Sequence, residues 1–276
     1  MDRDFELMGI LNVTPDSFSD GGEWFDTQEA VSHGLELIAA GAQIIDIGGE
    51  STRPGARSVA LDEELRRVIP TVEALRAADA QIRISLDTSK AEVVRRGLEA
   101  GATLVNDVTS LRTDPQIAEM TAAAGAQLCL MHMAGNPRTM QRAPVYEDVV
   151  AEVKRFLEER MDFAIRHGVP ERQIILDPGI GFGKSVEHNL ELIGRLDELV
   201  ALGRPVLIGT SRKSFLGHLT GRDVGERLAA TLASNLLAYE RGAQIFRVHD
   251  VAPHRDALII AMALRRLGRA VDTVGA

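Results

Sequence analysis

The chain has 276 residues and a formal net charge of -9, with 45% hydrophobic and 26% charged residues. This composition supports a large core, yet no apolar run approaches the ~20 residues needed to cross a bilayer, and the acidic start MDRDFELMG does not match a signal peptide, so we expect a cytoplasmic protein without a membrane partner. The acidic balance and the few aromatic residues argue against nucleic-acid binding, and the single cysteine, Cys129, excludes a disulfide framework within the chain.

Eight short apolar runs, rich in Ile, Val and Leu, recur along the chain. Runs of this kind are typical of strands buried on both faces, as in a parallel sheet. They cover residues 6–11, 43–45, 82–86, 102–105, 127–130, 174–176, 205–208 and 244–246. Nearly every run ends in polar or charged residues, which are Asn12, Asp46, Asp87, Asn106, His132 after Met131, Asp177, Ser211-Arg212-Lys213, and Arg247 with His249. We therefore expect an active site at the strand ends.

Segments with helical periodicity separate the runs, and four of them end in Gly-Ala, at residues 41–42, 101–102, 125–126 and 242–243. Glycine suits a helix C-terminus because it takes the left-handed conformation without a side-chain clash. The repeated β-α unit predicts a single domain over residues 1–276 with the fold of a (β/α)8 TIM barrel, whose usual size is about 250 residues. A doubly wound open sheet is the alternative, and it too binds ligands at the carboxyl ends of its strands.

Three long irregular stretches follow the first, second and fifth predicted strands, at residues 14–27, 50–60 and 134–146. Each contains Pro and Gly. Loops longer than the usual two to six or so residues of α/β units tend to bind ligands or cover them. We expect these loops to share the rim that carries the strand ends.

Cations gather at the predicted strand ends of this acidic chain, and they are Arg53, Arg212, Lys213, Arg247 and His249. Such a cluster indicates a small anionic ligand that carries phosphate. Asn12, at the end of the first strand, could offer a hard oxygen to Mg²⁺, which often shares its ligation with phosphate.

The strand-end acceptors indicate the rest of the ligand. A heterocycle with adjacent ring-amide and amine donors would satisfy Asp177 and Asn106, although pairing with Arg or Lys is the structural alternative for any one of these groups. The segment LDPGIGFGKS is not a Walker loop, because Pro178 stands where that loop needs glycine. Its alternating glycines instead suggest a backbone close to a flat ligand, with Phe182 available to cover it.

Several segments together carry a resemblance to a known family. They are MGILNVTPDSFSDGG, DIGGESTRPGA, LDTSKAEV, LVNDV, LMHMAGNPRTMQ, LDPGIGFGK, GTSRKSFLG and RVHDV, in order from Met8 to about Val251. As a set they resemble the dihydropteroate synthases of folate biosynthesis. The resemblance implies condensation of 6-hydroxymethyl-7,8-dihydropterin pyrophosphate with p-aminobenzoate, Mg²⁺ as cofactor, a homodimer and a sulfonamide target.

The resemblance also implies roles for individual residues. Those that would hold the pterin are Asp87, Asn106, Asp177 and Lys213, with Met131 and Phe182 lining its pocket. Those that would receive pyrophosphate are Arg247 and His249, and Asn12 would bind Mg²⁺. Those that would complete the p-aminobenzoate site are Thr52, Arg53, Pro54 and Phe18, together with Lys213 and Ser214. The implied catalytic residues are Asp87, Lys213, Arg247 and His249.

Two other functions fit a pterin pocket. Methyltransferases that move a methyl group from methyltetrahydrofolate to a corrinoid share the strand-end acceptors, but they need no pyrophosphate receptor, so residues 211–214 and 247–250 favour the synthase. A non-catalytic pterin-binding protein is the third possibility. For His132, on an apolar strand, a supporting role is expected rather than a catalytic or metal-binding one.

The helical segment at residues 226–239 has Leu228, Leu232, Leu236 and Tyr239 at helical spacing. We expect one stripe of this segment to pack on the barrel. Further apolar residues broaden the face, and the remaining width could contact a partner subunit.

Overall fold

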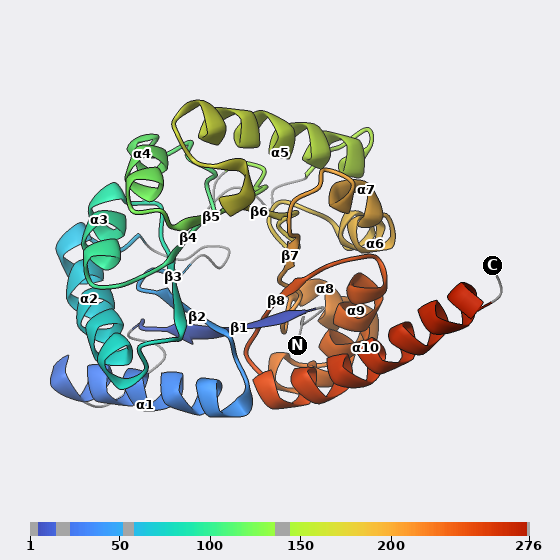
Figure 1. The fold of residues 1–276 in the computed structure, drawn as a ribbon, viewed down its shortest axis with the longest axis horizontal. Helices are drawn as coiled ribbons and strands as arrows, with labels where there is room; N and C mark the ends of the chain where they lie inside the picture. The colour runs from blue at the N-terminus through green and yellow to red at the C-terminus, as the bar shows by residue number, and fades with distance from the viewer. Residues whose placement is uncertain (1–4, 15–22, 52–57, 136–143, 275–276) are drawn as a thin grey trace.

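The computed structural model describes residues 5–14, 23–51, 58–135 and 144–274, and in this part of the chain eight parallel strands form one sheet (Figure 1). The strands are β1 (Glu6–Asn12), β2 (Ile44–Gly48), β3 (Arg83–Asp87), β4 (Leu104–Asp107), β5 (Gln127–Met131), β6 (Ile174–Asp177), β7 (Leu207–Ile208) and β8 (Ile245–Val248). Their order in the sheet is β6-β5-β4-β3-β2-β1-β8-β7.

The sheet closes between β6 and the residues just before β7. There the N–H of Leu176 donates to the carbonyl of Pro205 at 2.9 Å, and an isolated parallel bridge pairs Leu176 with Val206. The predicted TIM barrel is therefore confirmed, and the open-sheet alternative is wrong.

Helices alternate with the strands and surround them in Figure 1. They are α1 (Glu23–Ala40), α2 (Leu61–Ala78), α3 (Ala91–Glu99), α4 (Gln116–Ala123), α5 (Val149–Arg166), α6 (Val186–Gly194), α7 (Asp197–Val200), α8 (Ser214–Thr220), α9 (Leu228–Glu240) and α10 (Val251–Val274), with 3-10 turns at Glu171–Gln173 and Val224–Glu226. All four Gly-Ala glycines take positive φ, from 65° to 111°, as predicted for helix ends. Among the described residues, no helix is both long and apolar enough to span a bilayer.

Two apolar cores hold the barrel. The larger lies between the strands and the helices, and a second cluster lies among barrel-lining positions of seven strands. That cluster consists of Met8, Ile44, Leu104, Cys129, Ile175, Leu207 and Ile245, each no more than 3% exposed. Because successive side chains of a strand point to opposite faces, the residue two positions further along each strand lines the barrel as well. This alternation determines which side chains line the barrel next to the inner cluster, where the site lies.

Predicted boundaries differ from the structure at β2 and at α1. Strand β2 continues through Asp46 to Gly48, so Asp46 lies inside the strand rather than at its end. Helix α1 begins at Glu23, inside the predicted loop 14–27, because residues 23–27 contain no Gly or Pro to prevent a helix.

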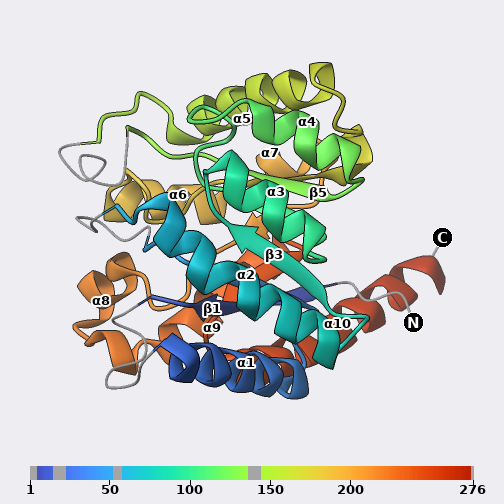
Figure 2. The ribbon, with the colours of Figure 1, turned by 90° about the vertical axis from the view of Figure 1, so that its left-hand side faces the viewer.

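Figure 2 shows the direction of the strands: β3 points toward the side where α8 lies, while the end of α10 lies on the opposite side.

The predicted barrel-facing stripe of α9 is only partly correct. Tyr239 is buried, but Leu228 is 36% exposed, and the inward positions are mainly small or polar. Ser234 donates to Thr210 Oγ1, and Thr210 donates to Asn235 Oδ1, both at 2.8 Å. Because Ser234, Thr210 and the Asn235 amide oxygen bond to one another in the interior, the helix packs with its leucines turned partly outward, against the rule that the apolar stripe faces the core.

Candidate active site

Four polar side chains form a layer above the inner core, one from each even-numbered strand. They are Asp46, Asn106, Asp177 and Arg247, which stand two residues after Ile44, Leu104, Ile175 and Ile245. In TIM barrels such layers are built by alternate strands. On the neighbouring odd-numbered strands, Asp87 of β3 is the register partner of Asn106, and Met131 of β5 is the register partner of Asp177. The predicted strand-end residues thus share the carboxyl mouth of the barrel.

Arg247 is held by two carboxylates in this layer. Its Nε donates to Asp46 Oδ2 at 2.6 Å and its Nη2 to Asp87 Oδ2 at 2.8 Å, while Asn106 Nδ2 donates to the same Asp46 oxygen at 3.1 Å. Ion pairing is therefore part of what offsets the burial of Asp46 and Asp87.

Several acceptors in the mouth remain unsatisfied. Within the described residues, Oδ1 of Asp46, Asp87 and Asn106 and Oγ of Ser85 are buried without a hydrogen-bond partner. Buried polar atoms are nearly always paired, with protein, water or ligand. This group is suited to a ligand that presents several N–H donors.

The loop after β6 carries a second acceptor. Gly179 N donates to Asp177 Oδ1 at 2.7 Å, which leaves Oδ2 without a hydrogen bond to the described residues. Gly179 has φ +69°, and a Cβ there would lie 1.9 Å from the carbonyl oxygen of His132, so only glycine fits. Further along, Phe182 packs against a small cluster of Val108, Met131 and Met133. Met131 therefore lies beside both Asp177 and Phe182.

Lys213, which immediately precedes α8, lies over this loop. Its Nζ is 3.9 Å from the centroid of the Phe182 ring, a cation–π contact, and its stem passes so close to Gly181 that a Cβ there would lie 2.9 Å from Lys213 Cδ. One ammonium therefore borders both the Asp177 loop and the start of α8.

His249 follows β8 and is held by Ser211. The Ser211 hydroxyl accepts from the backbone N–H of His249 at 3.2 Å and lies 2.9 Å from its Nδ1. A hydroxyl that donates to Nδ1 leaves the imidazole proton on Nε2. Arg212, with φ 57°, forms a bidentate pair with Asp250, at 2.6 and 3.1 Å, and so ties the β7 loop to the β8 loop.

Burial governs the acidity of the two principal carboxyl groups. It raises the pKa of Asp87 to about 7, against the charge of Arg247, and the pKa of Asp177 to about 6, against the Gly179 N–H and the charge of Lys213. Burial opposes ionisation of Arg247, yet the carboxylates of Asp46 and Asp87 raise its pKa. Hydrogen bonds from a ligand would favour both carboxylates and lower their pKa values.

Known proteins resemble this chain over most of its length. A family described as pterin binding enzyme matches residues 8–249. The chain is 49% identical over 257 residues to the dihydropteroate synthase of Escherichia coli, covering 93% of this chain and 90% of that protein. The chain belongs to the dihydropteroate synthase family.

Solved structures of the family agree in fold. The dihydropteroate synthase of Xanthomonas albilineans with 4-aminobenzoic acid is 50% identical to this chain with a TM-score of 0.89, and the alignment covers 96% of this chain and 94% of that one. The enzyme from the same organism in complex with 7,8-dihydropteroate is 47% identical with a TM-score of 0.86 and the same coverage.

Other residues of the predicted family site lie at the ends of helices and strands or outside the described residues. Ser214 is exposed as the first residue of α8, next to Lys213, and Asn12 is half-buried at the end of β1, opposite Gly48. The residues predicted for the p-aminobenzoate loops, Phe18, Thr52, Arg53 and Pro54, lie outside the described residues.

Two residues in or beside the site received no role from sequence reasoning. The sequence marks Asp46 only as one of several strand-end acids, yet Asp46 joins Arg247 to Asn106. Lys184 belongs to a segment that lacks the Walker pattern, and the structure buries its ammonium among carbonyl groups. A lysine within a glycine-rich loop is a weak sequence signal, because nothing in the pattern shows where its side chain goes.

Proposed function

We propose that this chain condenses 6-hydroxymethyl-7,8-dihydropterin pyrophosphate with p-aminobenzoate to give 7,8-dihydropteroate and pyrophosphate, as a transferase of folate biosynthesis. Family membership supports the assignment, and the X. albilineans relative was solved with the amine substrate of this reaction and with its pteroate product. The observation in the site that carries the proposal is the meeting of buried acceptors with the cations Lys213 and Arg247 in one barrel mouth.

The acceptor layer suits the pterin. A pterin presents ring N–H and exocyclic amine donors along one edge, and Asp177 Oδ2, Asn106 Oδ1 and Asp87 Oδ1 are acceptors without a partner among the described residues. In this proposal the Phe182 and Met131 side chains cover the flat ring.

The cations suit the departing pyrophosphate. Arg247 uses Nε and Nη2 for the carboxylates, so within the described residues Nη1 is the nitrogen left to receive a phosphate oxygen. His249, oriented by Ser211, is the second proposed receptor. Both stabilise the negative charge that gathers as the C–O bond to pyrophosphate breaks.

The donor set fits Mg²⁺ only as a shared site. The described residues contain no group of three acidic or histidine side chains that could hold a metal by themselves. Asn12 offers a single amide oxygen, which agrees with the habit of Mg²⁺ to keep several waters and take its remaining ligands from phosphate. When bound there, Mg²⁺ would supply further positive charge beside the pyrophosphate.

The chemistry requires no nucleophilic side chain. The electron-rich pterin spreads the positive charge left on its methylene carbon, and the neutral aryl amine attacks that carbon and loses its proton after the bond forms. We therefore expect dissociative character. In this mechanism Asp87, Lys213, Arg247 and His249 act by charge and position rather than as strong bases.

The test is pyrophosphate release by the purified protein given both substrates and Mg²⁺. Release that depends on p-aminobenzoate, is lost with a chelator and is accompanied by 7,8-dihydropteroate supports the proposal, and a sulfonamide should then compete with the amine. Binding of the pterin pyrophosphate without turnover would reject it. Methyl transfer from methyltetrahydrofolate to a corrinoid would establish the rival function, which the cations of the mouth disfavour.

We expect pterin affinity to rise with pH. The pKa of Asp87 is raised to about 7 and that of Asp177 to about 6, so below these values each must lose a proton before it accepts from the ligand. Affinity should increase up to about tenfold per pH unit for each proton released, and level off above about pH 7. Calorimetric titration in two buffers of different ionisation enthalpy counts the protons. An affinity that falls over this range would contradict the assignment.

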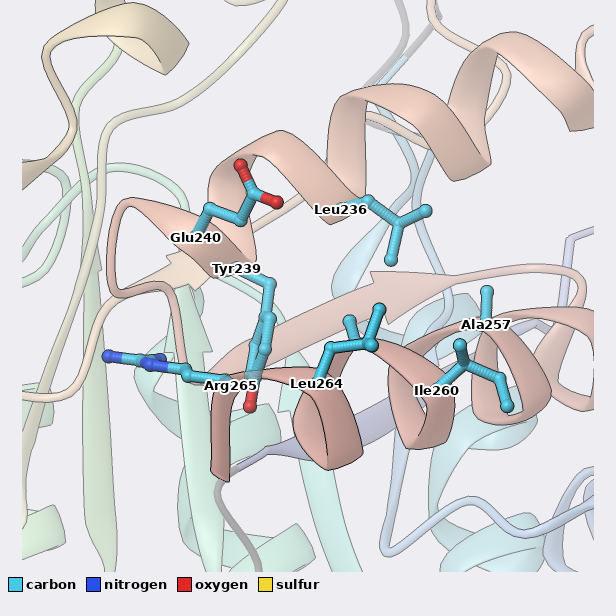
Figure 3. Close-up of a pocket in the computed structure, with 8 residues that line it drawn as sticks. Leu236, Tyr239, Glu240, Ala257, Ile260, Leu264 and Arg265 are labelled. Carbon is cyan, nitrogen blue, oxygen red and sulfur yellow. The ribbon is translucent and has the colours of Figure 1, made fainter. Parts of the chain in front are cut away.

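A homodimer through α9 and α10 is part of the proposal. Figure 3 shows a groove between these helices, lined by Leu236, Tyr239, Ala257, Ile260, Leu264 and Arg265 among others. Beside it Leu237 is 57% exposed, and on α10 Ile260 and Leu264 are 63% and 64% exposed. Apolar residues clustered in this way on the surface favour a protein contact, and a second copy of the chain is the partner that the family resemblance implies.

Replacement of Ile260 and Leu264 by Glu is expected to disrupt this dimer. The carboxylates would lose hydration in an apolar contact, so the mass should fall from twice 29.9 kDa to one chain. Light scattering measures the mass, and Leu35→Glu, at a 40% exposed position on α1, is the control. A wild-type protein of single-chain mass at micromolar concentration would contradict the dimer.

The cytoplasmic location stays a prediction from the sequence.

A further inference from the structure

Lys184 is a buried lysine with neutral partners. Lys184 comes shortly after Phe182 in the loop that follows β6, and it is 3% exposed. Nζ lies 2.9 Å from His132 Nδ1, 3.0 Å from the carbonyl oxygen of Gly179 and 3.1 Å from that of Phe182, with the His132 carbonyl more distant at 3.4 Å. An ammonium has three hydrogens, and these three close acceptors can take all of them.

The His132 ring is adapted to this contact. An ammonium cannot accept a hydrogen bond, so Nδ1 must be the acceptor and the ring proton must lie on Nε2. Burial and the charge of Lys184 lower the pKa of His132 to about 2, which keeps the imidazole neutral. The ring is fixed further by an edge-on contact with Phe156, at 4.9 Å between centroids.

The carbonyls that Lys184 gathers belong to the turn that carries the ligand groups. Phe182 N donates to Gly179 O at 3.1 Å, and Gly179 N donates to Asp177 Oδ1 at 2.7 Å. Lys184 therefore binds both ends of the turn from Gly179 to Phe182, and His132 connects that turn to the end of β5. Without the ammonium, the Phe182 carbonyl oxygen would lose the donor that reaches it, the Gly179 carbonyl oxygen would keep only the Phe182 N–H, and the turn would lose its central anchor.

We propose that Lys184 and His132 are positioning residues, which hold Asp177 and Phe182 in the arrangement that binds the pterin without touching it themselves. The inference rests on the proposed function, because it takes Asp177 and Phe182 as the residues that contact the pterin. It adds an interior support to the site, from residues that the sequence placed in no catalytic role.

Matched substitutions test the support. Lys184→Met removes the donors while keeping an unbranched side chain of similar length. His132→Leu removes the acceptor, whereas His132→Asn keeps a polar atom at the Nδ1 position. Lys154→Met, at a half-buried position on α5, is the lysine control. All are compared at about pH 6, below the pKa of about 7 to which burial lowers Lys184, so that its three donors are present.

Hydrogen exchange at the Phe182 amide and the steady-state constants are the readouts. For Lys184→Met and His132→Leu we expect exchange at least about tenfold faster and kcat/KM for the pterin substrate about 10- to 100-fold lower, mostly through KM. His132→Asn and Lys154→Met should stay near wild type. A merely structural loss would reduce the active fraction, lowering kcat with KM unchanged.

The proposal is overturned if Lys184→Met folds with unchanged exchange and KM. If Lys184→Met does not fold, the two His132 variants provide the test. Equal exchange rates and equal KM values for His132→Leu and His132→Asn would overturn the proposal. A wild type without turnover would reject the proposed function instead, while the exchange rates would still test the positioning role.

Discussion

Lys213→Ala is expected to lower kcat by about 10²–10³-fold with the barrel intact. The Lys213 ammonium lies 3.9 Å from the Phe182 ring centroid, and its charge acts on both Asp87 and Asp177. It thus borders both the acceptor layer and the start of α8. Because the side chain is only half-buried, its removal leaves the packing of the core unchanged.

Steady-state kinetics with both substrates measures the effect, and thermal unfolding checks the fold. Lys154→Ala is the control for loss of a lysine from a half-buried position. If Lys213→Ala kept wild-type kcat and KM for both substrates, Lys213 would have to be removed from the proposed site.

Asp177→Asn is expected to lower kcat/KM for the pterin substrate by about 10²-fold. Gly179 N–H donates to Asp177 Oδ1 at 2.7 Å, so the oxygen of an asparagine would have to face Gly179. Its NH₂ would then stand at the Oδ2 position and meet the donors of the pterin. The substitution therefore replaces an acceptor by a donor at nearly constant volume, and ligand affinity should fall without loss of packing.

Stability distinguishes this effect from damage to the fold. Burial raises the pKa of Asp177 to about 6, above its ordinary 3.8, so the folded state binds the proton more tightly than the unfolded chain. As pH rises from 3.8 to about 6, ionisation of Asp177 therefore lowers the free energy of unfolding, and the loss persists at higher pH. At about pH 8 the Asn variant should unfold at an equal or higher temperature than wild type. Asp62→Asn, exposed on α2, is the control. A variant that binds pterin normally would contradict the assignment.

Strand-end residues were the part of the site that pattern reading could reach. Asp177 and Asn106 each stand two residues after an apolar residue of the inner core, and period-two alternation carries both into the barrel mouth once the strands are parallel. Their partners were not predictable in the same way. The pairing of Arg247 with Asp46 joins residues 201 positions apart, and no local spacing encodes it.

Helix α9 illustrates where periodicity fails. Its leucines predicted a barrel-facing stripe, but the helix instead turns Ser234 and Asn235 inward, where Thr210 accepts a hydrogen bond from Ser234 and donates one to Asn235 Oδ1. A polar side chain becomes suitable for the interior only when a distant partner satisfies it. That condition depends on tertiary structure and cannot be read from a helical stripe.

The sequence by itself determined the barrel, the mouth as the place of the site, and the residue types that meet there. It could do so because strand period, helix-ending glycines and strand-end polar residues are local features. Only the tertiary structure decided that Arg247 is shared between Asp46 and Asp87, and that Lys184 is turned inward onto the loop of Asp177 and Phe182. Those contacts depend on how the strands and loops pack together, since hydrogen bonds and charges act through space and not along the chain.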